Sequence, residues 1–256
     1  MEQVGEYIIN WLRTYCLEAK QDGFIVGISG GVDSALTSTL CAKTGLKTWL
    51  ISMPIHQQPD QLLRAQHHIH WLNSNFSNVS SLEVDLTSAF ESLRSALPLA
   101  VANHELSMAN TRSRIRMTTL YAIGQTNRCL VAGTGNKIED FGVGFYTKYG
   151  DGGVDLSPIA DLTKTEVWNL ASHLGVSSEI TSAKPTDGLW GEDRSDEDQL
   201  GATYPELEWA MAFSGSEDDI SDRQREVLKI YRHFNRVNQH KMLPIPVCLI
   251  PEALRR

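Results

Sequence analysis

A chain of 256 residues is long enough for one large α/β domain with a substantial core, or for two small ones. Its net charge of −8 and its lack of a basic block weigh against nucleic acid as the main partner. Because no apolar run approaches about 18 residues and no signal peptide precedes the first helix, we expect a cytoplasmic protein without a membrane partner.

Helical spacing and short apolar runs alternate along the chain. In chain order, we expect helices at residues 3–20, 33–44, 59–73, 87–96, 104–127, 204–212 and 220–239. Strands are expected at residues 24–29, 48–53, 82–86, 129–134 and 154–159. This alternation predicts an α/β, three-layer Rossmann-like fold, with a mostly parallel five-stranded sheet and helices on both faces. We expect residues 1–256 to form a single domain.

The segment 184–202 interrupts the alternation, because its residues are mainly polar. Solvated linkers usually have such a composition. A connection of this length inside a compact domain, however, favours a lid or a disordered segment. We therefore expect a mobile loop, and both closure over a substrate and a purely connecting role fit its composition.

The cysteines and a group of histidines lack the spacing of a metal site. The cysteines are expected to be buried free thiols, since they lie far apart in apolar or helical surroundings, at Cys16, Cys41, Cys129 and Cys248. Three histidines of the helix at 59–73 have no carboxylate or cysteine at ligand spacing, and we expect them on the helix surface: His67, His68 and His70.

Residues 27–34 form the most informative segment, Gly-Ile-Ser-Gly-Gly-Val-Asp-Ser. A buried strand that runs into a Gly-rich turn and then a helix N-terminus makes an anion site, because backbone N–H groups and the helix dipole favour a phosphate. Asp33 stands where it could hold Mg²⁺ against that phosphate. The missing Gly-Lys-Ser/Thr ending excludes a Walker A loop. An ordinary turn in which Ser29 or Asp33 caps the helix is the alternative.

A second segment, 133–155, combines many glycines with charged side chains such as Lys137, Lys148 and Asp151. A purely structural role gives little reason for this composition. Residues 29–34 and 134–139 both follow predicted strands. Because ligands of parallel α/β sheets bind at the carboxyl ends of the strands, we expect the two segments to converge there.

These motifs carry a family resemblance over nearly the whole chain. Residues 27–34 resemble the pyrophosphate loop of the ATP-pyrophosphatase superfamily, whose members cleave ATP between the α and β phosphates. The chain resembles the NAD synthetase family, in particular its ammonia-dependent, single-domain form. Five blocks carry the likeness: residues 27–34, 110–117, 133–155, 158–165 and 185–201, with His240 and Lys241 near the end. Between residues 139 and 148 some family members have one residue fewer, which leaves the geometry of this loop open.

The resemblance implies a reaction. ATP adenylates the nicotinate carboxylate of deamido-NAD and releases pyrophosphate, after which ammonia displaces AMP to give NAD⁺. ATP and Mg²⁺ are then required. Glutamine-dependent relatives carry an additional amidase domain, for which 256 residues leave no room, so free ammonia or a separate partner is the expected nitrogen source. The family also implies a homodimer, with the helix at 104–127 as the candidate interface.

The resemblance also assigns residues. It places ATP at Gly27, Ile28, Ser29, Gly30, Gly31, Val32, Asp33, Ser34, Thr134, Lys164 and Thr186. It places Mg²⁺ at Asp33 and Glu139. It places deamido-NAD at Arg114, Lys148, Asp155, His240 and Lys241. Lys148 is a candidate to neutralise the nicotinate carboxylate, and Lys164 is the cation that opposes developing phosphate charge. No general base for ammonia is evident; Asp151 and Asp155 are both candidates.

Less specific interpretations remain for several of these residues. Arg112, Arg114 and Arg116 alternate along a helix, so one or two of them could be surface charges. Asp155 could cap a turn, and the pair at 240–241 could be solvated.

As rival functions we consider another adenylating amidotransferase, a tRNA thiolase and a non-catalytic ATP-sensing module. A thiolase needs reactive cysteines and a basic surface, and a sensor has no need of Glu139 or of the block at 148–155.

Overall fold

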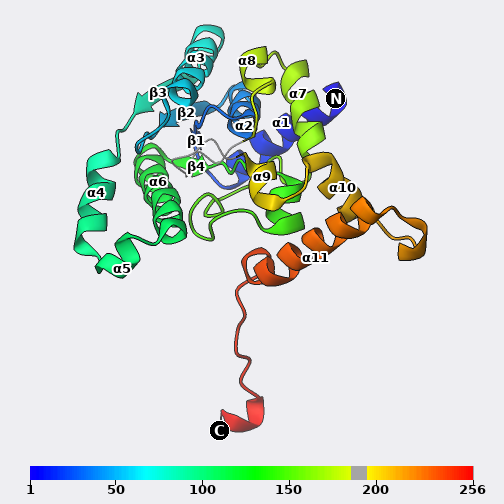
Figure 1. The fold of residues 1–256 in the computed structure, drawn as a ribbon. Helices are drawn as coiled ribbons and strands as arrows, with labels where there is room; N and C mark the ends of the chain where they lie inside the picture. The colour runs from blue at the N-terminus through cyan, green and yellow to red at the C-terminus, as the bar shows by residue number, and fades with distance from the viewer. Residues whose placement is uncertain (186–194, 256) are drawn as a thin grey trace.

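The computed structural model describes residues 1–185 and 195–255. Within them, four parallel strands form one sheet in the order β3-β2-β1-β4. The strands are β1 (Gly23–Gly27), β2 (Lys47–Ser52), β3 (Val79–Glu83) and β4 (Cys129–Val131). Helices lie on both faces of this sheet (Figure 1). The α/β class with a parallel sheet is therefore confirmed.

The predicted fifth strand at 154–159 is wrong. This segment makes one isolated parallel bridge, between Ala132 and Leu156, and no strand. Pro158 gives the physical reason, because it has no N–H with which to extend a ladder. The third strand lies at Val79–Glu83 and not at 82–86. It is an edge strand with mostly exposed side chains, so alternation there does not report a buried face.

The seven helices expected by residue range are all present with similar bounds, and the described residues contain four further helices, α5, α7, α8 and α9. Their bounds are α1 (Glu2–Glu18), α2 (Val32–Lys43), α3 (Pro59–Asn75), α4 (Thr87–Ala96), α5 (Leu99–Ala102), α6 (Glu105–Asn127), α7 (Lys164–His173), α8 (Ser178–Thr181), α9 (Asp196–Leu200), α10 (Tyr204–Ala212) and α11 (Asp222–Met242). A π-helix, η1 (Ile138–Val143), and two 3₁₀ turns, η2 (Glu217–Asp219) and η3 (Glu252–Leu254), complete the elements. None of the helices in the described part of the chain is both long and apolar enough to cross a membrane.

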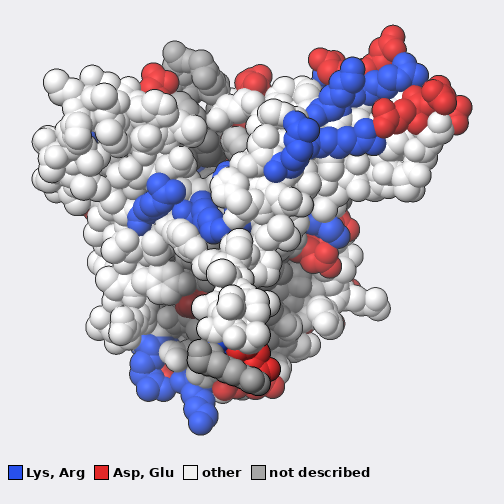
Figure 2. All heavy atoms as spheres, turned by 90° about the horizontal axis from the view of Figure 1, so that it is seen from below, with Lys and Arg blue, Asp and Glu red and all other residues white. Residues whose placement is uncertain are grey.

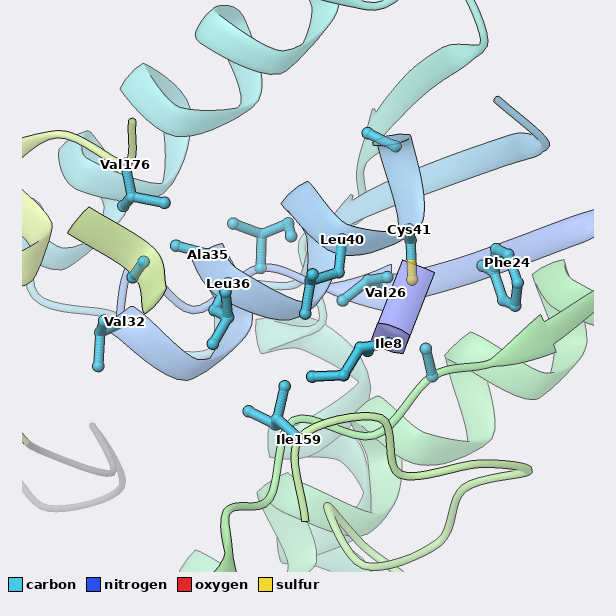
Figure 3. Close-up of a cluster of buried hydrophobic side chains, with 14 of the residues drawn as sticks. Ile8, Phe24, Val26, Val32, Ala35, Leu36, Leu40, Cys41, Ile159 and Val176 are labelled. Carbon is cyan, nitrogen blue, oxygen red and sulfur yellow. The ribbon is translucent and has the colours of Figure 1, made fainter. Parts of the chain in front are cut away.

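Alternate residues of β1 supply two separate cores. Phe24 and Val26 face α1, α2, α3 and α7, where α2 is buried along nearly its whole length. Figure 3 shows Val26 among the α2 side chains Leu36 and Leu40. Ile25 points to the opposite face, into a cluster covered by α4 and α6. This packing fixes the carboxyl end of β1 and the start of α2, which carry the loop at 27–34.

A third apolar cluster joins α10 and α11 to η1. It contains Ile138, Tyr204 and Leu207, all fully buried. This cluster sets the position of the segment that follows β4. Beyond α11, residues 243–255 extend away from the rest of the described chain (Figure 1).

Two expectations about buried and exposed side chains are wrong. Cys248 lies in the extended C-terminal segment and is exposed, whereas the other three cysteines are buried. His68 is buried, not on the helix surface, because it shares one face of α3 with Ala65 and Leu72 at helical spacing. His67 and His70 are exposed, as expected.

Candidate active site

The loop between β1 and α2 leaves a helix N-terminus open. Gly31 is the N-cap of α2, and no side chain caps this helix. Ser29 Oγ accepts a hydrogen bond from Gly31 N (3.2 Å), and Ser34 Oγ donates to Gly31 O (3.0 Å). The two serines thus stabilise the loop itself, and the N–H groups of the first helical turn stay available to an anion. The structure therefore does not show the simple side-chain cap that the sequence left as an alternative.

Gly30 is required in this loop for two reasons. Its φ of +86° lies in the left-handed region, and a Cβ there would lie 2.5 Å from Gln61 O. Any side chain at this position would therefore combine backbone strain with a steric clash against α3.

A buried ammonium lies between two carboxylates at the start of α2. Lys164 Nζ is 2.7 Å from Asp33 Oδ2 and 3.0 Å from Glu139 Oε1, and the lysine side chain is only 3% exposed. Lys164 is the first residue of α7, which begins with a capping box formed by Thr163 and Glu166. The three charged groups come from α2, η1 and α7, so the fold creates this cluster from distant parts of the chain.

The charges of this cluster shift the titration of its members. Burial alone would lower the pKa of Lys164, but the charges of Asp33 and Glu139 outweigh burial and raise it. Burial raises the pKa of Asp33, which the ammonium opposes. For Glu139, the attraction of the ammonium and the hydrogen bond from Tyr204 outweigh burial and lower the pKa. Lys164 is therefore held as a cation.

Two neutral side chains orient the carboxylates. Tyr204 OH donates to Glu139 Oε1 at 2.6 Å, and its ring lies under the Lys164 ammonium, 4.7 Å from the centroid. Asn136 Nδ2 donates to Asp33 Oδ1 at 3.1 Å. Sequence reasoning missed both residues. Tyr204 lies 65 positions from Glu139, and within the predicted helix it resembles an ordinary core aromatic.

The same carboxylates are suited to Mg²⁺. One Asp33 oxygen and one Glu139 oxygen already share a single cationic atom, and carboxylate oxygens are the donors that hard cations prefer. In the described residues, no three His, Cys, Asp or Glu side chains are grouped as a complete metal site. The remaining ligands of an ion there would be phosphate oxygens and water, the usual arrangement for Mg²⁺.

A cavity of about 620 Å³ opens beside the loop. It lies at the carboxyl ends of β1, β2 and β4, where residues of the predicted segments 29–34 and 134–139 converge. Among the residues predicted for ATP, metal or catalysis, those that line it are Gly27, Ile28, Ser29, Gly30, Gly31, Val32, Asp33, Ser34, Thr134, Glu139, Asp151 and Lys164. Thr186 lies outside the described residues.

Asp151 is fixed on one side and open on the other. Its Oδ1 accepts hydrogen bonds from Ser113 Oγ (2.6 Å) and Thr147 N (3.0 Å). Burial raises the pKa of Asp151, and these hydrogen bonds oppose the shift. Because the residue lines the cavity and only Oδ1 takes part in these bonds, Oδ2 can accept a hydrogen bond from a ligand.

The residues predicted for deamido-NAD divide into three groups. Lys148 Nζ donates to His240 O (2.5 Å), and Arg114 donates twice to Lys148 O (3.3 Å), so these three form one hydrogen-bonded cluster. Lys241 lines the cavity and donates to Gly144 O and Tyr146 O. Asp155 accepts from Tyr121 OH and Val131 N, and so anchors the end of β4.

The loop between Glu139 and Lys148, whose geometry the sequence left open, begins as the π-helix η1. A π-turn holds one more residue than an α-turn, so it can take up an extra residue without moving its ends. Within it, Glu139 keeps its contact with Lys164. The π-helix thus carries one of the two carboxylates of the cluster.

Comparisons with known proteins point to one family. The NAD synthase family model matches residues 4–244. The NH(3)-dependent NAD(+) synthetase of Carboxydothermus hydrogenoformans is 37% identical over 245 residues, which cover 94% of this chain and 98% of that protein. The structure of NMN synthetase from Francisella tularensis has a TM-score of 0.86 at 28% identity and 98% coverage of both chains. The NH3-dependent NAD synthetase of Campylobacter jejuni shares the fold, with a TM-score of 0.76 at 22% identity and coverage of 97% and 99%. This chain belongs to the NAD synthase family.

Proposed function

We propose that this chain is an ammonia-dependent NAD⁺ synthase, a ligase that forms a C–N bond. It would use ATP to adenylate the nicotinate carboxylate of deamido-NAD, and ammonia would then displace AMP. The observation that carries the proposal is the buried ammonium of Lys164 between Asp33 and Glu139, beside the uncapped N-terminus of α2. A cation and an open helix start suit a nucleoside triphosphate whose pyrophosphate must leave.

In this account the loop at 29–34 binds the ATP phosphates through its backbone N–H groups. Lys164 stabilises the negative charge that builds up on pyrophosphate as the bond to the α-phosphate breaks. Asp33 and Glu139 would hold Mg²⁺, which neutralises phosphate charge when bound. Tyr204 keeps the Glu139 carboxylate in place for that task.

Asp151 is the residue that we assign to ammonia. Ammonium must lose a proton before it attacks the acyl adenylate, and the attack releases another. The free oxygen of Asp151 can hold the nitrogen and accept a proton, while Ser113 and Thr147 fix the carboxylate. Asp155 suits this task less well, because both its oxygens accept hydrogen bonds within the protein.

We assign the remainder of the dinucleotide to the cluster of Arg114, Lys148 and His240 together with Lys241, where cations can meet the phosphates. We also propose a cytoplasmic homodimer with α6 in its interface, and ammonia taken from solution or from a separate partner.

The three buried cysteines and the distribution of charge argue against a tRNA thiolase. On the face seen in Figure 2, acidic and basic side chains lie side by side, notably around η2 and the start of α11.

A second candidate substrate is nicotinate mononucleotide. The Francisella structure, whose TM-score to this chain is 0.86, is named an NMN synthetase. The same adenylation chemistry would then act on the smaller nucleotide, since the reacting carboxylate is identical.

The test is a product assay with purified protein, ATP, Mg²⁺ and ammonium or glutamine, offering deamido-NAD and nicotinate mononucleotide in separate and competing reactions. The proposal expects NAD⁺, AMP and pyrophosphate from deamido-NAD and ammonium, with a larger kcat/KM than for the mononucleotide. A reversed preference would favour NMN synthesis. No amide product from either substrate would refute the ligase assignment.

A further inference from the structure

Arg116 is a cavity-lining cation that the assignments above do not use. It lies on α6, one turn beyond Ser113, and lines the same cavity as Asp151 and Lys164. Its Nε donates to Met53 O at 3.0 Å, and its Nη2 donates to Gln57 Oε1 at 3.1 Å. The guanidinium thus connects α6 to the chain that follows β2, and these two contacts fix its orientation.

The partners of Arg116 are neutral, as are the two backbone oxygens bonded to Lys241, whereas Lys164 and Arg64 have carboxylate partners. Lys164 has two carboxylates, and Arg64 has Asp60 at 2.9 Å. In the part of the chain that the structure describes, no carboxylate lies within ion-pair distance of Arg116. A guanidinium has five N–H groups. Two of them donate to Met53 and Gln57. Because Arg116 lines the cavity, its other N–H groups can donate to a ligand there.

The surroundings of Arg116 favour an anionic ligand. Burial lowers the pKa of Arg116 to about 10, and the charge of Arg112 adds to this shift. The charge of Asp151 acts in the opposite direction, but no carboxylate of the described residues lies within ion-pair distance of this half-buried guanidinium, so an anion in the cavity would stabilise its charge. A planar guanidinium with several free donors matches the two oxygens of a carboxylate.

The chemistry of the proposed reaction indicates which anion this is. Adenylation brings a carboxylate against the α-phosphate of ATP, and both carry negative charge. We assign the phosphates to the N-terminus of α2 and to Lys164. Arg116 instead belongs to α6, which forms a different wall of the cavity. A cation on that wall reduces the repulsion between the two reactants.

We propose that Arg116 binds the carboxylate of the pyridine carboxylate substrate and holds it toward the α-phosphate of ATP. This inference rests on the proposed function. It gives Arg116 the role that the family resemblance suggested for Lys148, whose ammonium instead donates to His240 O. Arg116 would then distinguish the acid substrate from the neutral amide product.

The test compares the binding of deamido-NAD and NAD⁺, which differ only in carboxylate against amide. Dissociation constants are measured by calorimetry for the wild type, Arg116→Gln, Arg116→Lys and Lys148→Met, with the ATP affinity of each variant. Wild type should prefer the acid. Arg116→Gln should lose about 10- to 100-fold in affinity for deamido-NAD and little for NAD⁺, because a charged hydrogen bond is lost from one ligand only. Arg116→Lys should recover part of the preference.

A matched control is Arg112→Gln, on the same helix, whose guanidinium lies over the Phe90 ring at 5.0 Å. It should keep the acid-to-amide preference. Three results would overturn the inference: equal weakening of both ligands by Arg116→Gln, loss of ATP affinity with the preference retained, or loss of the preference in Lys148→Met alone. If the wild type binds neither ligand, the proposed function fails as well, so the two failures are distinguishable.

Discussion

Lys164 Nζ lies 2.7 Å from Asp33 Oδ2, although 131 residues separate the two in the chain. Each residue belongs to the first turn of its helix, Asp33 on α2 and Lys164 on α7. Because the two helices pack together, their N-termini meet at one point, which is also the end of β1. Two helix starts and one buried ammonium thus give this point a positive potential suited to polyphosphate.

Lys164→Met should reduce kcat by about 10²- to 10³-fold, because the charge that stabilises departing pyrophosphate is lost. It should also destabilise the protein by roughly 3 kcal/mol, since Asp33 and Glu139 would face each other without a counter-ion. Steady-state kinetics and urea unfolding measure the two effects. Lys137→Met removes a lysine paired with the exposed Asp161 and should change stability by less than about 1 kcal/mol. Equal effects of both substitutions would contradict the role of Lys164.

Tyr204→Phe should weaken Mg²⁺ binding by about 10- to 100-fold, because Glu139 loses the hydroxyl that orients it. The buried hydrogen bond should also cost about 1 kcal/mol of stability. Titration with Mg²⁺, or with Mn²⁺ followed by electron paramagnetic resonance, measures the affinity in the presence of ATP. Tyr7→Phe, at a residue that is 74% exposed, is the control and should leave the affinity unchanged. An unaltered titration for Tyr204→Phe would show that the hydroxyl does not position the ligand.

Gly30→Ala should destabilise the protein by more than about 2 kcal/mol and abolish ATP binding, because positive φ is combined with a contact of 2.5 Å to Gln61 O. Gly45→Ala is a matched control. Its φ is +75°, yet a Cβ there would meet nothing within 4 Å, so it should cost only about 1 kcal/mol. Unfolding free energies and ATP calorimetry compare the two. If both variants lose the same stability, the close approach of α3 to the loop is not what requires glycine.

His68 should make the protein less stable in mild acid. Burial lowers its folded-state pKa from the ordinary 6.5 to about 4. Between these values the unfolded chain binds the proton and the folded chain does not, so this contribution to stability falls as pH decreases from 6.5 toward 4. The loss should reach roughly 3 kcal/mol. His68→Gln should remove this loss of stability. Urea unfolding at pH 7 and pH 5 measures the difference in unfolding free energy between the two pH values. The control His70→Gln, at an exposed residue, should keep the difference seen in the wild type. An unchanged pH dependence in His68→Gln would contradict the assignment.

The sequence predicted those features that depend on local chemistry. The loop at 27–34 was identifiable because glycines, serines and Asp33 follow a buried strand directly, and these neighbours act on one another in the fold. Helices with a clear apolar stripe, such as α1, were also predictable. His68 could have been assigned correctly, since it continues the stripe of Ala65 and Leu72.

Features that depend on distant residues were not predictable in this way. The apolar run at 154–159 resembled a strand, but Pro158 and the turn before it restrict its pairing to one bridge. Tyr204 meets Glu139 only because α10 packs on η1, which no local pattern encodes. Three alternating arginines gave no indication that Arg116 would line the cavity while Arg112 would lie over Phe90.

The adenylation of the substrate carboxylate is the central claim, and isotope transfer tests it most directly. Deamido-NAD carrying ¹⁸O in both carboxylate oxygens is converted with ATP, Mg²⁺ and ammonium, and the products are analysed by mass spectrometry. The account predicts one ¹⁸O in AMP and the other in the amide of NAD⁺. Unlabelled AMP, or label in inorganic phosphate, would show that the carboxylate does not attack the α-phosphate and would contradict the account.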